Sequence, residues 1–269
     1  MPFATVDDDI ELFYTDRGSG PSALLIHGWA CDSHDWMWLS PALERDHRVI
    51  AADLRGHGRS SVPPTGFTPP RFAADLARLI DGLGAGPAVV VGHSLGTVVA
   101  STLAVERSDL VRALVLVDPV YGIPAELMPM LEASVGAFAG SDPVEVATAA
   151  FGLFYTPSTP EHLPAWHLRR VAGTPPHVIA QTLTNIYVGP EAWAVGEKTG
   201  AYLARRRAPV LAVYADDSRA AVERSVLPDD GVGRVEVWPG AGHFLHQEQP
   251  DRFNALILEW LDTVAKRSR

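Results

Sequence analysis

Gly92-His93-Ser94-Leu95-Gly96 stands between two apolar segments that differ in character. Residues 87–91 are short and rich in β-branched side chains, which is typical of a buried strand, whereas residues 97–104 have a composition that favours a helix. Ser94 is therefore predicted to lie on a strand-to-helix turn. The backbone crosses itself closely in such a turn, so a Cβ atom at position 92 or 96 would clash, and both positions are glycine.

A turn of this kind gives Ser94 a chemical role. It lifts the hydroxyl clear of the sheet, and the N-terminal amides of the following helix point toward whatever the hydroxyl attacks. A serine hydroxyl is a poor nucleophile at neutral pH, so it needs a base within hydrogen-bond reach and a third group that orients this base. We therefore predict that Ser94 is a nucleophile and that a histidine and a carboxylate accompany it.

The composition excludes several other classes of protein. The formal net charge of −10 over 269 residues leaves no basic surface for a polyanion, so no nucleic-acid partner is expected. Cys31 is the single cysteine, which excludes an internal disulfide, and no His or carboxylate spacing indicates a metal site or a cofactor. The N-terminus has no leader-like apolar region, and no apolar run approaches ~18 residues. We expect a soluble, cytoplasmic protein without a membrane partner.

Predicted strands and helices alternate along most of the chain, which is the pattern of a mainly parallel sheet with helices on both faces. The strands are predicted at 3–6, 10–15, 23–26, 48–52, 87–91, 113–117, 210–214 and 235–238, and helices at 36–45, 71–83, 97–104, 219–227 and 251–265. Residues 120–208 break this regularity with many Pro and Gly residues, aromatic side chains and helix-like pieces. We expect one core domain formed by 1–119 and 209–269, with 120–208 inserted as a helical cap.

The best-placed base is His243. It lies in a Gly-rich loop, Pro239-Gly240-Ala241-Gly242-His243, that follows the last predicted strand and precedes the last helix. A histidine in this loop can reach over the carboxyl ends of the strands, where the turn at Ser94 also emerges. His246, three residues further along, is the second candidate.

Four ordered motifs carry a resemblance to a known family. They are Leu25-Ile26-His27-Gly28-Trp29, Asp53-Leu54-Arg55-Gly56-His57-Gly58-Arg59-Ser60, the pentapeptide around Ser94, and Gly242-His243. In order and spacing they are similar to the α/β-hydrolase family over almost the whole chain except the insertion. The resemblance implies an α/β-hydrolase fold, with a mostly parallel eight-stranded sheet, helices on both faces and a helical cap. It also implies an oxyanion hole formed by the backbone amides of Trp29 and Leu95.

The acidic residue departs from the usual family pattern. Many members carry it in a Gly-x-x-Asp tetrapeptide after the strand equivalent to 210–214, but here that tetrapeptide reads Ala215-Asp216-Asp217-Ser218. A second position is available at Asp118, directly after the strand 113–117, where zearalenone lactonases and cofactor-free 3-hydroxy-4-oxoquinoline dioxygenases of this fold place their acid. We predict Asp118 as the acid, with Asp217 and then Asp216 as alternatives.

These residues together indicate a serine hydrolase. Ser94, His243 and Asp118 would cleave a carboxylic ester or a lactone through an acyl-enzyme, and the cap would supply an apolar pocket for a hydrophobic small molecule. The alternative is a cofactor-independent dioxygenase that cleaves a 3-hydroxy-4-quinolone ring, in which His243 and Asp118 act as a dyad and Ser94 only binds substrate. The sequence leaves the substrate open, and it leaves open whether the protein is a monomer or a homodimer.

Overall fold

The structure is a computed structural model in which residues 2–267 are described. Its centre is one eight-stranded sheet with the strand order β1-β2-β4-β3-β5-β6-β7-β8. β1 and β2 form an antiparallel hairpin, β2 also runs antiparallel to β4, and every later pairing is parallel. The strands are β1 (Phe3–Asp7), β2 (Ile10–Gly18), β3 (Ser22–Ile26), β4 (Arg48–Ala52), β5 (Ala88–His93), β6 (Val111–Val117), β7 (Val210–Tyr214) and β8 (Arg234–Val237).

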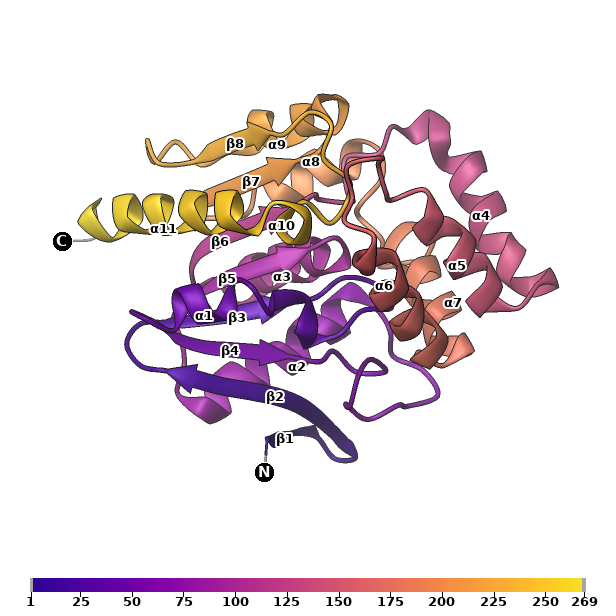
Figure 1. The fold of residues 1–269 in the computed structure, drawn as a ribbon, viewed down its shortest axis with the longest axis horizontal. Helices are drawn as coiled ribbons and strands as arrows, with labels where there is room; N and C mark the ends of the chain where they lie inside the picture. The colour runs from indigo at the N-terminus through magenta and orange to yellow at the C-terminus, as the bar shows by residue number, and fades with distance from the viewer. Residues whose placement is uncertain (1, 268–269) are drawn as a thin grey trace.

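Helices cover both faces of this sheet (Figure 1). Alternate side chains of the central strands point to opposite faces and enter two separate apolar clusters. One cluster packs under α1 (Ser40–Leu43) and α11 (Pro250–Arg267), and the other packs against α2 (Pro69–Leu83), α3 (Leu95–Glu106) and α9 (Ala220–Val226). The predicted mostly parallel sheet of eight strands with helices on both faces is confirmed.

Between β6 and β7 the chain leaves the sheet and forms five α-helices. They are α4 (Met128–Gly140), α5 (Pro143–Gly152), α6 (His162–Gly173), α7 (Pro176–Tyr187) and α8 (Glu197–Leu203). Figure 1 shows α4 to α7 gathered beyond the carboxyl ends of the parallel strands, whereas α8 returns to the side of the sheet. This arrangement places helices over the carboxyl ends of β5 and β6, so these helices cover the turns that follow the two strands.

The prediction of a continuous helix over 36–45 is wrong. The structure has a short 3-10 helix at Ser33–Trp36 and one turn of α-helix at Ser40–Leu43. Pro41 explains the break, because proline has no backbone N–H and is tolerated only in the first turn of a helix. The remaining short elements are 3-10 helices at Ser108–Leu110, Ala125–Leu127 and Asp217–Arg219 and the α-helix α10 (Leu245–Glu248).

Helix length and hydropathy bear on the question of a membrane span. Across residues 2–267, the helices are all too short or too polar to cross a lipid bilayer.

Candidate active site

The turn between β5 and α3 is held by close backbone contacts that only glycine allows. A Cβ atom on Gly92 would lie 2.2 Å from the carbonyl oxygen of Gly96, and one on Gly96 would lie 2.3 Å from the carbonyl oxygen of Ile26. Ser94 itself has a positive φ of 52°, a conformation that costs on the order of 1–3 kcal/mol for a residue with a side chain. The surrounding structure therefore forces Ser94 into this turn, with its amide bonded to the carbonyl of Val117 at 3.0 Å.

Two backbone amides beside Ser94 lack partners. Leu95 is the first residue of α3 and Trp29 follows the end of β3, and both residues line the same cavity as Ser94. Within residues 2–267, neither backbone N–H donates a hydrogen bond to another residue. Two unpaired donors beside a serine hydroxyl can stabilise the oxygen of a tetrahedral intermediate.

His27 holds the loop that carries Trp29. Its Nε2 accepts a hydrogen bond from the backbone N–H of Leu54 at 2.9 Å, which leaves Nδ1 protonated to donate to the carbonyl of Gly28 at 2.7 Å. The Trp29 indole also donates to the carbonyl of Ile179 at 3.0 Å, and this hydrogen bond holds the loop against α7. The Trp29 amide is thus fixed from both sides.

Asp118 and His243 are brought together although 125 residues separate them. Nδ1 of His243 donates to Oδ2 of Asp118 at 2.5 Å, and their side chains are 9% and 1% exposed. The loop of His243 is held in two further places, because its amide donates to the carbonyl of Phe154 at 2.9 Å and its carbonyl accepts from Nε2 of His93 at 3.0 Å. A carboxylate on Nδ1 orients the ring so that Nε2 is available to act as a base.

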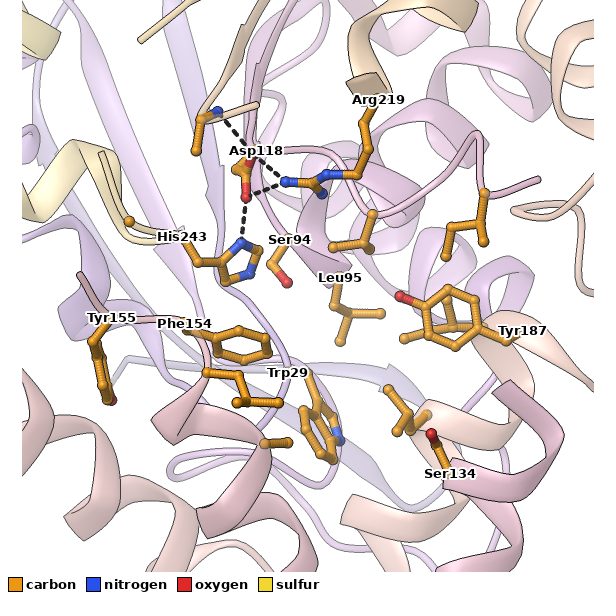
Figure 2. Close-up of a pocket in the computed structure, with 18 of the residues that line it drawn as sticks. Trp29, Ser94, Leu95, Asp118, Ser134, Phe154, Tyr155, Tyr187, Arg219 and His243 are labelled. Carbon is orange, nitrogen blue, oxygen red and sulfur yellow. Dashed lines mark hydrogen bonds and ion pairs between the residues drawn. The ribbon is translucent and has the colours of Figure 1, made fainter. Parts of the chain in front are cut away.

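Figure 2 shows Ser94 beside the imidazole of His243, with Asp118 on the opposite side of the ring. Within the described residues, the Ser94 hydroxyl makes no hydrogen bond, to His243 or to any other group. Hydrogen bonds between a nucleophile and its base are often long before substrate binds and tighten in the complex.

Burial and two hydrogen-bonding partners act on the pKa of Asp118 in opposite directions. Burial disfavours the charged form of the carboxyl, but the hydrogen bond from His243 and the guanidinium of Arg219 outweigh burial, so the pKa of Asp118 lies well below its ordinary value. Its Oδ1 also accepts from the backbone N–H of Ala215 at 3.0 Å. Asp118 is therefore an ionised carboxylate with a fixed orientation.

The other candidate residues lie away from the imidazole of His243. Asp217 is 70% exposed on its side chain and pairs with Arg224, and Asp216 accepts a hydrogen bond from the amide of Ser218 at 2.9 Å. His246 is buried among the rings of Trp36, His93 and Phe253. Of the three carboxylates considered from the sequence, Asp118 is the one that contacts His243.

A cavity of about 460 Å³ opens onto these groups. Ser94, His243 and Trp29 lie in its wall, together with side chains from the cap that are mostly apolar (Figure 2). Its lining from residues 120–208 consists of Val120, Ile123, Leu131, Ser134, Ala150, Leu153, Phe154, Tyr155, Thr156, Leu183, Ile186 and Tyr187. Over residues 2–267, no cluster of three or more His, Cys, Asp or Glu side chains is arranged to hold a metal ion.

Arg219 is the site residue that sequence reasoning missed. It follows the Ala215–Ser218 tetrapeptide directly and reaches back to Asp118. No sequence motif includes Arg219, and a single arginine after an acidic loop is typical of a surface residue. The aromatic side chains of residues 120–208 indicate an apolar pocket, and two of them, Phe154 and Tyr155, line the cavity. The other lining residues of this segment follow no periodicity that identifies them from the sequence.

Comparisons with known proteins agree with this fold. Residues 23–256 match the Alpha/beta hydrolase family. The non-heme haloperoxidase of Rhodococcus erythropolis is 29% identical in an alignment that covers 98% of this chain and 100% of that protein. The esterase EaEST from Exiguobacterium antarcticum superposes with a TM-score of 0.83 at 19% identity and covers 97% of this chain and 98% of its own. A thermophilic esterase from Thermogutta terrifontis gives a TM-score of 0.80 at 27% identity, over 98% and 97% of the two chains.

The chain belongs to the alpha/beta hydrolase family, since the family match spans most of its length. It is an enzyme of the α/β-hydrolase type, and its relatives include esterases, epoxide hydrolases and haloperoxidases.

Proposed function

We propose that this protein hydrolyses a carboxylic ester or a lactone of a hydrophobic small molecule through Ser94, His243 and Asp118. One observation carries the proposal: a serine on a strained strand-to-helix turn shares a cavity with a short His–Asp pair and with two unpaired backbone amides. These are the components that acyl transfer through a covalent intermediate requires.

The steps follow from the positions of the groups. Nε2 of His243 takes the proton of the Ser94 hydroxyl as its oxygen attacks the substrate carbonyl, and the amides of Trp29 and Leu95 stabilise the resulting oxyanion. The protonated imidazole gives its proton to the leaving alkoxide, which leaves an acyl group on Ser94. His243 then activates a water molecule that attacks the acyl-enzyme and returns the free acid.

The side chains that line the cavity favour an uncharged substrate. Most of its side chains are aliphatic or aromatic, and its one arginine, Arg219, already pairs with Asp118. A charged group on the substrate would lose hydration on entry without gaining an unpaired counter-ion. Burial also raises the pKa of Tyr187 to about 12, so this phenol is neutral and can serve as a hydrogen-bond donor.

Substrate screening with variants tests the proposal. Purified protein is assayed against p-nitrophenyl esters of graded chain length and against aliphatic and aromatic lactones. We expect hydrolysis by the wild type, and a loss of kcat of at least about a thousandfold in Ser94→Ala. Ser108→Ala, which changes an exposed serine beyond the end of α3, is the matched control.

The cofactor-independent dioxygenase stays the second candidate, because the His243–Asp118 hydrogen bond is short while the Ser94 hydroxyl has no partner among residues 2–267. A dyad of this kind could remove a proton from a 3-hydroxy-4-quinolone without a serine nucleophile. Oxygen uptake with such a quinolone, retained in Ser94→Ala, would favour this candidate over the hydrolase.

A further inference from the structure

Arg219 makes an unusually complete set of contacts with the acidic residue of the site. Its Nη2 donates to Oδ1 of Asp118 at 2.8 Å and to Oδ2 at 2.9 Å (Figure 2). Its Nη1 donates to the carbonyl of Pro119 at 2.8 Å. The guanidinium thereby spans the carboxylate and the backbone that follows it. Arg219 also lines the cavity, with its side chain 31% exposed.

The loop after β7 is folded so that it presents this arginine. Asp216 accepts a hydrogen bond from the amide of Ser218 and so caps the 3-10 helix that ends at Arg219, whereas the exposed Asp217 points away from the site and pairs with Arg224. The first residue of the same loop, Ala215, donates its amide to Asp118. The loop thus contributes two donors to a carboxylate that directly follows the neighbouring strand β6.

Asp118 needs these donors for an electrostatic reason. Its side chain is 1% exposed, and its φ of 41° holds it in a conformation that residues with side chains rarely adopt. A buried carboxylate is costly unless an opposite charge or several hydrogen bonds compensate it. While the imidazole of His243 is neutral, the cation that contacts Asp118 directly is Arg219.

We propose that Arg219 is a positioning residue that keeps Asp118 ionised and aligned on His243 when the imidazole is neutral, and that weakens the hold of Asp118 on the imidazolium. This inference rests on the proposed function of the site. Arg219 acts through Asp118 and does not itself touch the reacting atoms.

The charges of the site predict how the pH profile depends on Arg219. The guanidinium and the imidazole both bind Oδ2 of Asp118, at 2.9 and 2.5 Å, so a protonated imidazole lies within about 6 Å of a second cation. Removing that cation favours the imidazolium. We expect the low-pH limb of the kcat/KM profile to move to higher pH by about one unit.

Other titratable groups near the site do not mask this shift. Burial holds the pKa of His93 well below its usual range, and that of Tyr214 well above its own. Exposed Asp216 has a lowered pKa through its hydrogen bonds with Ser218, so it stays charged. The remaining groups that interact with His243 or Arg219 in residues 2–267 are the buried His167 and His246, with pKa values of about 4 and 3, and the half-buried Tyr187, with a pKa of about 12.

Three variants test the inference. Arg219→Met removes both the positive charge and the hydrogen bonds of the guanidinium, whereas Arg219→Lys keeps the positive charge without the guanidinium. Arg224→Met, which removes a neighbouring ion-paired arginine, is the control. For Arg219→Met we expect kcat to fall tenfold to a hundredfold with KM changed less than about threefold, and the low-pH limb to move up by about one unit. In Arg219→Lys the limb should return close to its wild-type position, and Arg224→Met should match the wild type.

A second readout does not depend on turnover. The proton in the short Nδ1–Oδ2 bond of His243 should give a far-downfield proton NMR signal, which Arg219→Met should shift or broaden and Arg219→Lys should largely restore. An unshifted pH limb in a folded Arg219→Met protein would overturn the inference, as would an unchanged NMR signal. If Arg219→Met does not fold, Arg219→Gln takes its place in both measurements. If the wild type cleaves no ester or lactone, the proposed function fails, while the NMR signal still tests the role of Arg219.

Discussion

The buried histidines predict that this protein loses stability in mild acid. Burial lowers the pKa of His167 to about 4 and the pKa values of His57 and His246 to about 3. In the unfolded chain a histidine has a pKa of about 6.5. Below that pH the unfolded state therefore binds protons that the folded state does not, so the free energy of unfolding falls as the pH falls.

The size of this effect can be worked out at pH 5. A histidine that stays neutral in the folded state and titrates near pH 6.5 in the unfolded state contributes a loss of about 2 kcal/mol at pH 5 relative to pH 8. These three histidines alone predict a loss of about 6 kcal/mol, a large share of the ~5–15 kcal/mol that stabilises a typical domain, and the buried His93, whose pKa also lies well below its usual range, adds to this loss. The loss begins near pH 6.5 and continues until the pH reaches the folded-state pKa values.

Urea unfolding followed by tryptophan fluorescence at pH 8 and pH 5 measures this difference. His246→Phe should reduce the loss between the two pH values by about 2 kcal/mol, because it removes one of the three groups. His34→Gln, which changes an exposed histidine, is the control and should leave the loss unchanged. A protein whose free energy of unfolding differs by less than about 1 kcal/mol between pH 8 and pH 5 would refute the reasoning.

Three further predictions concern the site and its turn. Asp118→Asn should lower kcat by about a thousandfold or more in the ester assay, because Nδ1 of His243 loses its carboxylate, and unaltered turnover would argue against this role. Asp217→Asn should leave kcat within twofold, and a large loss would revive Asp217 as the acid. Gly96→Ala should cost about 3 kcal/mol in urea unfolding, since its Cβ would meet the carbonyl oxygen of Ile26 at 2.3 Å, and wild-type stability would contradict the steric account.

Much of the fold could be predicted because its determinants are local. The alternation of apolar runs with helical segments predicts all eight strands. The two glycines around Ser94 indicate a close backbone contact that leaves no room for a Cβ atom. The prediction of a helix over 36–45 is wrong because Pro41, which must lie in the first turn of a helix, limits the α-helix to one turn at Ser40–Leu43.

The long-range contacts of the site were harder to predict. The departure from the Gly-x-x-Asp pattern and the resemblance to members with their acid after the strand 113–117 indicate Asp118 over Asp217. Its 2.5 Å contact with His243, however, depends on two loops that meet only in three dimensions. Arg219 could not be found at all, since an arginine after an exposed turn has no local pattern that indicates a buried partner. Likewise, neither spacing nor composition distinguishes His167 and His246 from surface histidines. His167 is buried where α6 contacts Gln247 in α10, and His246 is buried against the rings of Trp36 and His93, so both depend on contacts between residues distant in the chain.

The role of Ser94 as the nucleophile is tested most directly by mass spectrometry after reaction with a fluorophosphonate ester. We expect a single phosphonyl adduct on the peptide that contains Ser94, parallel loss of ester hydrolysis, and no adduct in Ser94→Ala. Hydrolysis that persists while Ser94 is unmodified, or that continues at the wild-type rate in Ser94→Ala, would contradict the claim that Ser94 attacks the substrate.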